Sequence, residues 1–219
     1  WVRSNNIEAS TRKSGSWSLV SVLSILTSSN PDVKISSNGQ AIAVWQSLSS
    51  GSDILVSDNL TISTNIWAAT KNITTPTTAL RFNYPKVAID SNGNATVAAF
   101  RYNFNSASGA YSNVQVLSFS LSSGATSWTQ LPSFLSNSGI GNPANLKIRL
   151  KADVNGDVLA VWTNLYDGMT YTIESSNKLN GGSWPVFVTL QNPTVYSFGA
   201  DIAISQGSAL LVNMLWDDV

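Results

Sequence analysis

The sequence predicts an all-β fold, a β-propeller of four four-stranded antiparallel blades. Three observations lead to this prediction. A tryptophan that follows a small polar residue or Ile recurs with spacings of 50, 61 and 56 residues, at Trp17, Trp67, Trp128 and Trp184. A glycine recurs with similar spacing, at Gly39, Gly93, Gly156 and Gly207. Short segments of alternating apolar and polar residues lie between these markers, and a repeat of this size is typical of blades that stack around an axis.

The first two strands of a blade are clearest in residues 85–100, which match residues 31–45. Val87 and Ile89 alternate with other residues, as expected for a strand with one buried face. An Asn-Gly pair separates the two strands in three of the four copies, and it supplies the two positive-φ residues of a type I′ hairpin turn. In the fourth copy Gln206 replaces the asparagine.

A third alternating strand follows in each copy, for example residues 54–57, 114–119 and 171–175. A loop of small residues comes next, and the repeated tryptophan opens a fourth strand. The predicted blades are about residues 31–73, 85–134 and 147–190, with a fourth made of 199–219 together with 1–24. Sharing one blade between the two termini would close the ring without an open edge strand.

An alternative is a larger ring, completed by further sequence or by a second chain. The residue six positions after the repeated glycine differs between odd and even copies, as a duplicated two-blade unit would show. These residues are Trp45, Ala99, Trp162 and Asn213.

Composition excludes several classes of function. The 219 residues carry 12 basic and 12 acidic side chains, so there is no basic surface for nucleic acid. The longest apolar runs are strand-sized, so no membrane span is expected. Cysteine and histidine are both absent, which removes thiol nucleophiles, Ser-His or Cys-His pairs and the commonest metal ligand. No cofactor is predicted. The chain begins without Met, which we interpret as a processed form or a piece of a longer protein.

The carboxylates give two weak patterns. Asp153, Asn155 and Asp157 have the spacing that opens an EF-hand loop, but Gly156 precedes the third ligand and no Glu stands at the twelfth position, so we interpret this segment as a hairpin turn. Glu8 and Glu174 align in third strands, where outward-facing positions are expected, although paired carboxylates also serve glycoside hydrolysis. No metal site is predicted, and Asp217-Asp218 has no partner ligands.

The repeat Pro-x-Val-x-Ile-Asp-x-Asn-Gly-Asn-Ala, with a small-residue loop before Trp, resembles the repeats of bacterial secreted and surface β-propellers of the sialidase, or Asp-box, type. The Asp-box runs Ser-x-Asp-x-Gly-x-Thr-Trp. Residues 177–184 keep Gly181, Ser183 and Trp184, and another copy keeps Ser10 and Trp17 but has Arg12 in the Asp position. The family's arginine triad, Tyr-Glu pair and acid Asp find no equivalents here, so no catalytic residue is carried over.

A binding site is expected on the face that carries the long connections, because rigid blades position variable loops. These are the links between second and third strands (46–52, 103–110, 165–168, 217–219) and between blades (74–84, 135–146, 191–198). The candidate ligand-binding residues near them are Arg81, Tyr84, Arg101, Tyr102, Tyr166, Asp167, Tyr196 and Asp217.

The sequence therefore predicts a non-catalytic binding module, not an enzyme, that recognises a glycan or a protein through this face. We expect it to be secreted or on a cell surface. Two alternatives stay open: a glycoside hydrolase or lyase that uses loop carboxylates, and one structural half of a larger propeller, for which a dimer is expected. The repeated tryptophans are predicted to pack between blades rather than to bind sugar.

Overall fold

A computed structural model describes residues 1–24, 26–49, 52–61, 64, 66–75, 77, 80–132, 135–136, 138–139, 142–165, 171–191, 197–205 and 208–215. These residues form antiparallel strands and one short 3-10 turn, η1 (Pro143–Asn145). No helix in these ranges has the length and apolar character to cross a membrane. The all-β, antiparallel prediction is confirmed.

Three blades occupy the middle of the chain. The first blade contains β6 (Ser28–Ile35), β7 (Gln40–Ser49), β8 (Ser52–Thr61), β9 (Ile66–Trp67) and β10 (Lys71–Asn72). The second contains β11 (Leu80–Ile89), β12 (Ala95–Asn105), β13 (Ala110–Leu121) and β14 (Thr129–Gln130). The third contains β15 (Ile148–Ala152), β16 (Val158–Leu165), β17 (Tyr171–Lys178) and β18 (Val188–Gln191).

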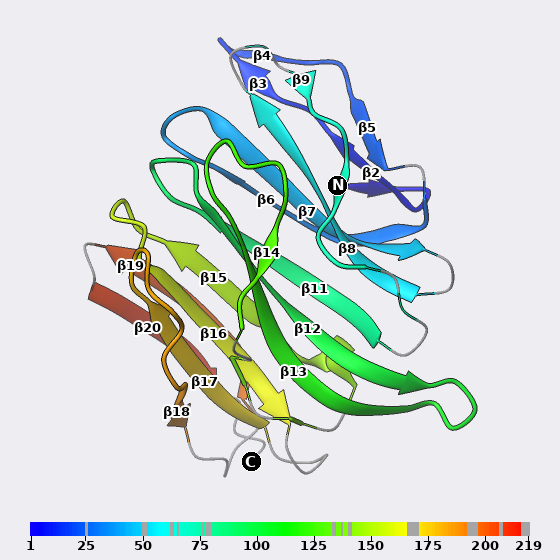
Figure 1. Ribbon diagram of the computed structural model, residues 1–219, viewed down its shortest axis with the longest axis vertical. Coiled ribbons are helices and arrows are strands. Elements are labelled where there is room, and N and C mark those ends of the chain that lie inside the picture. Colours follow the sequence, from blue (N-terminus) through cyan, green and yellow to red (C-terminus); the bar gives the residue numbers. More distant parts are fainter. Residues whose placement is uncertain are drawn as a thin grey trace.

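Smaller sheets lie at the two ends. The N-terminal sheet has the order β1 (Val2–Arg3), β2 (Asn6–Ala9), β5 (Ser21–Ser24), and the hairpin of β3 (Arg12–Lys13) and β4 (Ser16–Trp17) stands beside it. The C-terminal sheet is the pair β19 (Ser197–Ser205) and β20 (Ser208–Leu215). Figure 1 shows the sheets side by side in one row, with the N-terminal and C-terminal sheets at opposite ends.

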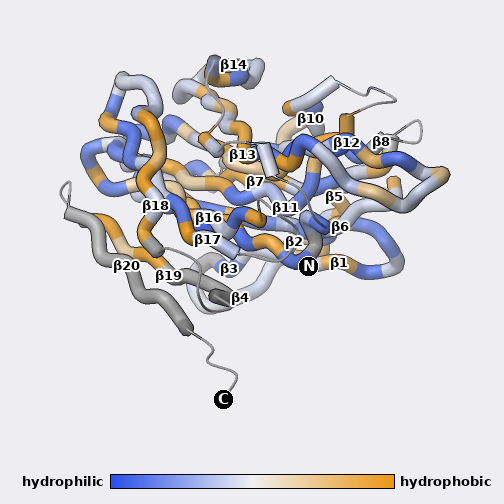
Figure 2. The backbone as a smooth tube through the Cα atoms, turned by 90° about the horizontal axis from the view of Figure 1, so that it is seen from below, coloured by the Kyte–Doolittle hydropathy of each residue, from blue (hydrophilic) through white to orange (hydrophobic). Residues whose placement is uncertain are grey.

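The first strands of neighbouring blades lie next to one another. β11 contacts β6 on one side and β15 on the other, and β15 contacts β19. These strands therefore form the inner edge of the row, and each blade extends outward from it. Hydrophobic and hydrophilic residues alternate along many strands, as Figure 2 shows, and successive side chains of a strand point to opposite faces of the blade.

Tight turns join the first two strands of each blade. Gly39, Gly93 and Gly156 have φ angles of 83°, 88° and 89°, which favour glycine. The carboxylate of Asp153 accepts hydrogen bonds from the backbone N–H groups of Asn155 at 2.9 Å and Asp157 at 3.0 Å. The segment that resembles an EF-hand opening thus serves as the hairpin turn that we expected.

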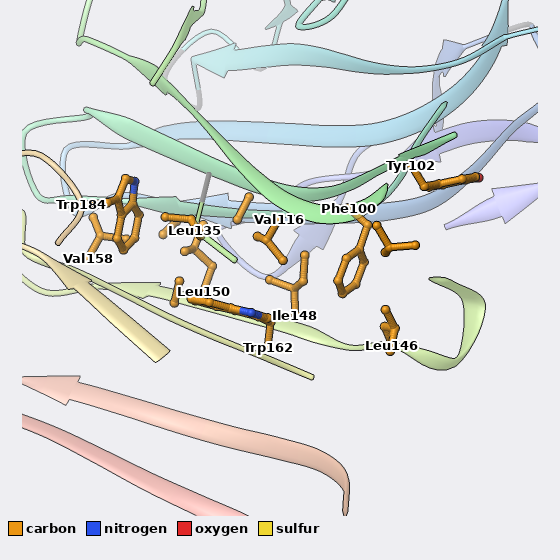
Figure 3. Packing of buried hydrophobic residues seen from close by; sticks show 14 of the residues in the cluster. Phe100, Tyr102, Val116, Leu135, Leu146, Ile148, Leu150, Val158, Trp162 and Trp184 are labelled. Carbon is orange, nitrogen blue, oxygen red and sulfur yellow. The ribbon is translucent and has the colours of Figure 1, made fainter. Parts of the chain in front are cut away.

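Apolar side chains fill the spaces between sheets. Figure 3 shows the cluster between the second and third blades, where Phe100 and Val116 face Ile148 and Trp162. Similar clusters join the first blade to the second and to the N-terminal sheet, and the third blade to the C-terminal sheet. Burial of these side chains is the main favourable term that holds the blades together.

The repeated tryptophans take part in these clusters, as predicted, in three copies. Trp184 and Trp128 each pack against the preceding blade, and Trp67 packs against the N-terminal sheet. The indole N–H of Trp128 also donates to Ser57 Oγ at 2.8 Å. Trp17 differs, since it is 68% exposed.

The predicted sharing of one blade by the two termini is not found in the described residues. β2 pairs with β5 on one edge and with β1 on the other, and β20 pairs with β19. The reason is a hairpin that the sequence analysis missed: Ser4 and Asn5, at φ 49° and 66°, turn the chain so that Val2 lies opposite Ile7. The edge of β2 that was predicted to pair with β20 thus pairs with β1 instead.

The register identifies β1 as the end of a second strand. Trp1 donates its indole N–H to Glu8 Oε2 at 2.8 Å, and Trp162 in the second strand of the third blade does the same to Glu174 at 2.6 Å. Trp1 therefore has the place that Trp162 holds in its blade. β1 is therefore equivalent to the end of a second strand, and β20 is the second strand of the C-terminal sheet.

Candidate functional site

One edge of the second blade gathers aromatic and charged side chains. Arg81 near the start of β11 lies opposite Tyr102 on β12, and Phe104 further along β12 lies opposite Tyr111 on β13. The long β12–β13 hairpin projects from the row in Figure 1. Asp53, near the start of β8 in the first blade, reaches the same edge, because it forms an ion pair with Arg81.

The three rings on β12 and β13 form what we call the aromatic cluster. The ring centroids of Tyr102 and Tyr111 are 5.5 Å apart, and those of Phe104 and Tyr111 are 5.1 Å apart. Tilted pairs at these distances are favourable arrangements for aromatic rings. The cluster presents part of its surface to solvent, since Phe104 and Tyr111 are half-buried while Tyr102 is buried.

Arg81 joins the cluster to the first blade. Its Nη1 lies 3.4 Å from Asp53 Oδ2, and its Cζ lies 5.9 Å from the centroid of Phe104. Asp53 attracts the planar guanidinium through its charge, and Phe104 attracts it through the quadrupole of its ring. About a quarter of the Arg81 side chain and a fifth of the Asp53 side chain remain exposed. A ligand can therefore reach both groups.

Tyr84 lies next to this group of residues because β11 has an irregularity there. The register of β11 and β12 shifts between Asn83 and Lys86, and Tyr84 has a φ of 51°. A bulge of this kind re-aims a side chain, and a non-glycine residue at positive φ stores strain. The Nζ of Lys147, just before β15, lies 5.8 Å from the Tyr84 ring.

Burial raises the pKa of the Tyr102 phenol, and the nearby Asp53 carboxylate raises it further, while Arg81 opposes the shift. Both main causes disfavour a phenolate, the first through lost hydration and the second through like charge. Tyr102 is therefore a neutral hydroxyl at physiological pH. It can donate a hydrogen bond but does not serve as a base.

Three of the eight predicted residues come together at this edge, namely Arg81, Tyr84 and Tyr102. Arg101 lies on β12 next to Tyr102, and strand alternation sends it to the opposite face. Tyr166, Asp167, Tyr196 and Asp217 lie outside the described residues.

Four site residues were not selected from the sequence: Asp53, Phe104, Tyr111 and Lys147. Asp53 and Tyr111 each stand one position beyond a link that the sequence analysis marked. Strands β12 and β13 continue to Asn105 and from Ala110, so half of the expected link is strand. The alternation of Tyr102 and Phe104 with polar neighbours was the signal that could have extended the strand.

The two glutamates do not face outward, and this expectation was wrong. Glu174 is buried beside Trp162 and Asn164, and Glu8 is buried between Trp1 and Arg3, with Arg3 Nε 3.2 Å away. Each carboxylate accepts an indole N–H, which gives the buried carboxylate a hydrogen-bond partner. The two glutamates lie in different sheets with the first and second blades between them, so they are not a catalytic pair.

Within the described ranges, no three Asp, Glu, His or Cys side chains gather in a way that could hold a metal ion. The site that these residues form is therefore one of aromatic rings, one ion pair and one neutral phenol. Such a surface suits a ligand with apolar C–H faces and many hydroxyl groups.

Comparison with known proteins supports the fold. No protein-family model matches the sequence, and no curated protein sequence matches it. Among solved structures, the chain is similar to a Trypanosoma rangeli sialidase in complex with the inhibitor DANA, with a TM-score of 0.56 and 10% identity over 97% of this chain and 38% of the sialidase.

Two further similarities are to a Penicillium chrysogenum alpha-L-arabinanase and to the polysaccharide lyase Uly1. Both have a TM-score of 0.50. The arabinanase is 14% identical, over 91% of this chain and 57% of its own length, and the lyase is 12% identical, over 86% and 47%. The chain thus spans less than two thirds of each matched protein. At these identities the likeness establishes the fold, and it confirms the predicted β-propeller with a sialidase-like arrangement of blades.

These matches contradict the prediction that the chain is not an enzyme, because the sialidase, the arabinanase and the lyase are all enzymes. That prediction rested on the repeat scaffold, the neutral polar surface and the missing catalytic side chains, histidine above all. The absence excludes only chemistry that needs an imidazole, and carboxylates, phenols and guanidinium groups supply other general acids, bases and electrostatic partners.

Proposed function

We propose that this protein is a glycan-cleaving enzyme, a glycoside hydrolase, whose active site lies at the edge where Asp53, Arg81 and the aromatic cluster meet. The observation that carries the proposal is the partly exposed Asp53–Arg81 pair beside these rings. The fold supports it, because enzymes that act on glycans occur among the propellers that resemble this chain.

Each part of the site has a role in this proposal. The aromatic cluster stacks on the C–H face of a sugar ring. Arg81 donates to a ring hydroxyl or to a carboxylate of the glycan, with the fixed fork that a guanidinium provides. The neutral Tyr102 hydroxyl donates a hydrogen bond to the sugar. Asp53 is the candidate general acid or base, because its carboxylate pairs with Arg81 and lies near Tyr102.

Hydrolysis needs a second carboxylate, about 5 to 10 Å from the first. Among the described residues of this edge, Asp53 is the single carboxylate.

An enzyme of this kind meets polymeric substrate outside the cell. We therefore propose that the protein is secreted or displayed on a cell surface. The neutral surface of hydroxyl and amide side chains agrees with glycans as the substrate class, since only 11% of the residues are charged.

The test is a substrate screen followed by a substitution. Purified protein is incubated with sialylated glycans, arabinans and uronate-containing polysaccharides, and new reducing ends are measured. On the best substrate, Asp53→Asn should lower kcat by about 100-fold or more, the usual effect of removing a general acid or base. Asp157→Asn, at the far hairpin turn, is the matched control and should retain full activity.

Two outcomes would reject the proposal. The absence of turnover on every glycan would reject a catalytic role, and full activity of Asp53→Asn would reject this active site. A product with the ultraviolet absorbance of an unsaturated uronate would show a lyase instead of a hydrolase.

A further inference from the structure

The first two blades carry the same irregularity in their inner strands, and they place different residues in it. Asn30 in β6 and Tyr84 in β11 each stand directly before a proline, and their φ angles are 52° and 51°. In both blades the register between the first and second strands shifts at this point. One bulge therefore recurs in the repeat, and the two copies of it can be compared.

In the first blade the residue at the bulge has a structural role. Asparagine adopts positive φ more readily than most residues. The Nδ2 of Asn30 donates to Gln46 Oε1 at 2.8 Å and to Asn83 Oδ1 at 2.9 Å. One amide thus joins the second strand of its own blade to the inner strand of the next blade, and the side chain is used within the protein.

In the second blade the same bulge holds a residue that does not favour it. A bulky side chain at positive φ is an outlier, and the proline that follows Tyr84 restricts its backbone further. Strain of this kind clusters at sites that bind ligands or perform catalysis. The ring of Tyr84 packs at the margin of the cluster between the second and third blades and stays half-buried. Part of this ring is therefore accessible to a ligand.

The third blade supplies a cation beside this ring. The backbone N–H of Lys147 donates to Thr163 Oγ1 at 2.7 Å, and its C=O accepts from the Thr163 N–H at 3.0 Å. The side chain is exposed, and its Nζ lies 5.8 Å from the centroid of the Tyr84 ring. No carboxylate among the described residues forms an ion pair with it. Lys147 thus has a fixed backbone and a charge that a ligand can neutralise.

These two residues lie beside the proposed active site. Burial is the main cause of the raised pKa of Tyr102. Asp53, Arg81 and Tyr84 also act on this phenol. The three side chains therefore surround one hydroxyl group, and a glycan bound at Asp53 and Arg81 extends within reach of Tyr84.

We propose that Tyr84 and Lys147 form a subsite for a second sugar unit of the glycan. The Tyr84 ring stacks on the C–H face of this unit, and Lys147 donates to one of its oxygens, a hydroxyl or a carboxylate. The inference rests on the proposed glycan-cleaving function. It adds to that function a ligand of at least two sugar units, because Arg81 and the aromatic cluster already bind the first.

The strained bulge suits this role. An asparagine at position 84, as at the equivalent position 30, would relax the backbone but would present no ring to a sugar. The bulge also fixes the direction of the ring before the ligand arrives, and a side chain that is already ordered loses less freedom on binding.

Affinity electrophoresis tests the subsite without requiring turnover. The full chain is run through gels that contain each glycan of the substrate screen, and retardation gives the dissociation constant. Tyr84→Asn, which accepts positive φ, should weaken binding by about 10-fold. Tyr84→Phe, which keeps the ring, should bind within about 2-fold of the wild type. Circular dichroism checks that both variants fold.

Lys147 gives a second and independent test. Lys147→Met should weaken binding by about 10-fold, because a charge-assisted hydrogen bond is lost. Lys151→Met, at another exposed lysine of β15, is the matched control and should bind as the wild type does. A loss on polygalacturonate that vanishes at about 0.5 M salt identifies a carboxylate as the partner, and a loss on arabinan that salt leaves unchanged identifies a hydroxyl.

The kinetic readout separates this proposal from the proposed function. On a substrate that is cleaved, Tyr84→Asn should raise KM by about 10-fold and leave kcat within about 2-fold, since binding alone is lost. Binding that depends on Tyr84 and Lys147 in a protein without turnover would support the subsite and reject the hydrolase.

Three results would overturn the subsite. These are unchanged binding in both Tyr84→Asn and Lys147→Met, equal losses in Tyr84→Asn and Tyr84→Phe, and a wild-type protein that no glycan of the screen retards. In the first two cases the proposed function still depends on the result for Asp53→Asn.

Discussion

At the scale of single residues, the strand opposite a buried tryptophan decides whether its indole N–H is satisfied. Trp162 lies opposite Glu174 and donates to it. Trp45, the equivalent residue of the first blade, lies opposite Val56, and its buried Nε1 has no hydrogen-bond partner among the described residues. A buried N–H without an acceptor costs about 1–3 kcal/mol. The glutamates in the third strands are therefore packing partners of tryptophans.

Asp58 is another buried carboxylate, and it leads to a prediction about pH. Burial on β8 raises its pKa from 3.8 to about 6, against the opposing effects of the Asn59 N–H and of Lys71. The folded state therefore binds this proton more tightly than the unfolded state. The resulting stabilisation is complete below about pH 4 and is lost as the pH rises through 6.

Asp58→Asn should remove this dependence, because the amide oxygen can still accept from Asn59 and carries no charge. We expect the variant to be more stable than the wild type at pH 7.5 by about 1–3 kcal/mol, and the difference to shrink at pH 4.5. Urea unfolding at the two pH values measures it. An equal difference at both pH values would show that Asp58 does not titrate in this range.

At the scale of elements, the blades are built on hairpins whose turn residues are readable from the sequence. The Asn-Gly pairs do form the turns, but only their glycines are at positive φ, so the predicted type I′ turn, which needs two such residues, is wrong. The turns differ in their surroundings. A Cβ at Gly39 would meet nothing within 4 Å, whereas one at Gly156 would lie 2.9 Å from Asn180 Cγ and 3.0 Å from Asp90 Oδ2. Gly156 thus serves both the turn and the close approach of the second blade.

This contrast separates the two roles of glycine. Gly39→Ala should lower the free energy of unfolding by about 1 kcal/mol, the cost of positive φ for an alanine. Gly156→Ala should cost about 1–3 kcal/mol more, because packed neighbours must move. Chemical denaturation of both variants gives the comparison. Equal losses would mean that the contact near Gly156 relaxes freely.

At the scale of the whole molecule, each sheet depends on the one before it. The repeated tryptophan of one sheet packs against the preceding sheet. The interfaces between sheets therefore contribute much of the folding stability. Trp184 is buried between the second and third blades, whereas Trp17 lies at the open end of the row. The tryptophan at one repeat position is therefore buried in one sheet and exposed in another, and we expect its removal to change stability by different amounts.

Trp184→Ala should lower the free energy of unfolding by about 3–5 kcal/mol, the usual cost of removing a buried aromatic side chain. Trp17→Ala should change the stability of the monomer by less than about 1 kcal/mol, because this side chain is exposed. Thermal unfolding at low protein concentration tests the pair. A large loss for Trp17→Ala in the monomer would show that the N-terminal sheet is covered in a way that this structure does not have.

The sequence by itself determined the fold class, the hairpin turns and the packing role of three repeated tryptophans. These features depend on residues close together in the chain, through strand alternation and the φ preferences of Asn-Gly turns. Of its candidate ligand-binding residues, Arg81, Tyr84 and Tyr102 lie together at one edge, and their role in binding stays a prediction.

Only the tertiary structure decided which residues lie beside these three side chains and which strand pairs with β2. Asp53 meets Arg81 across two blades, and the hairpin of β1 and β2 occupies the edge on which ring closure depended. Contacts of this kind involve the relative positions of whole sheets. Such positions are set by the summed packing of many side chains far apart in the sequence, and no local pattern records them.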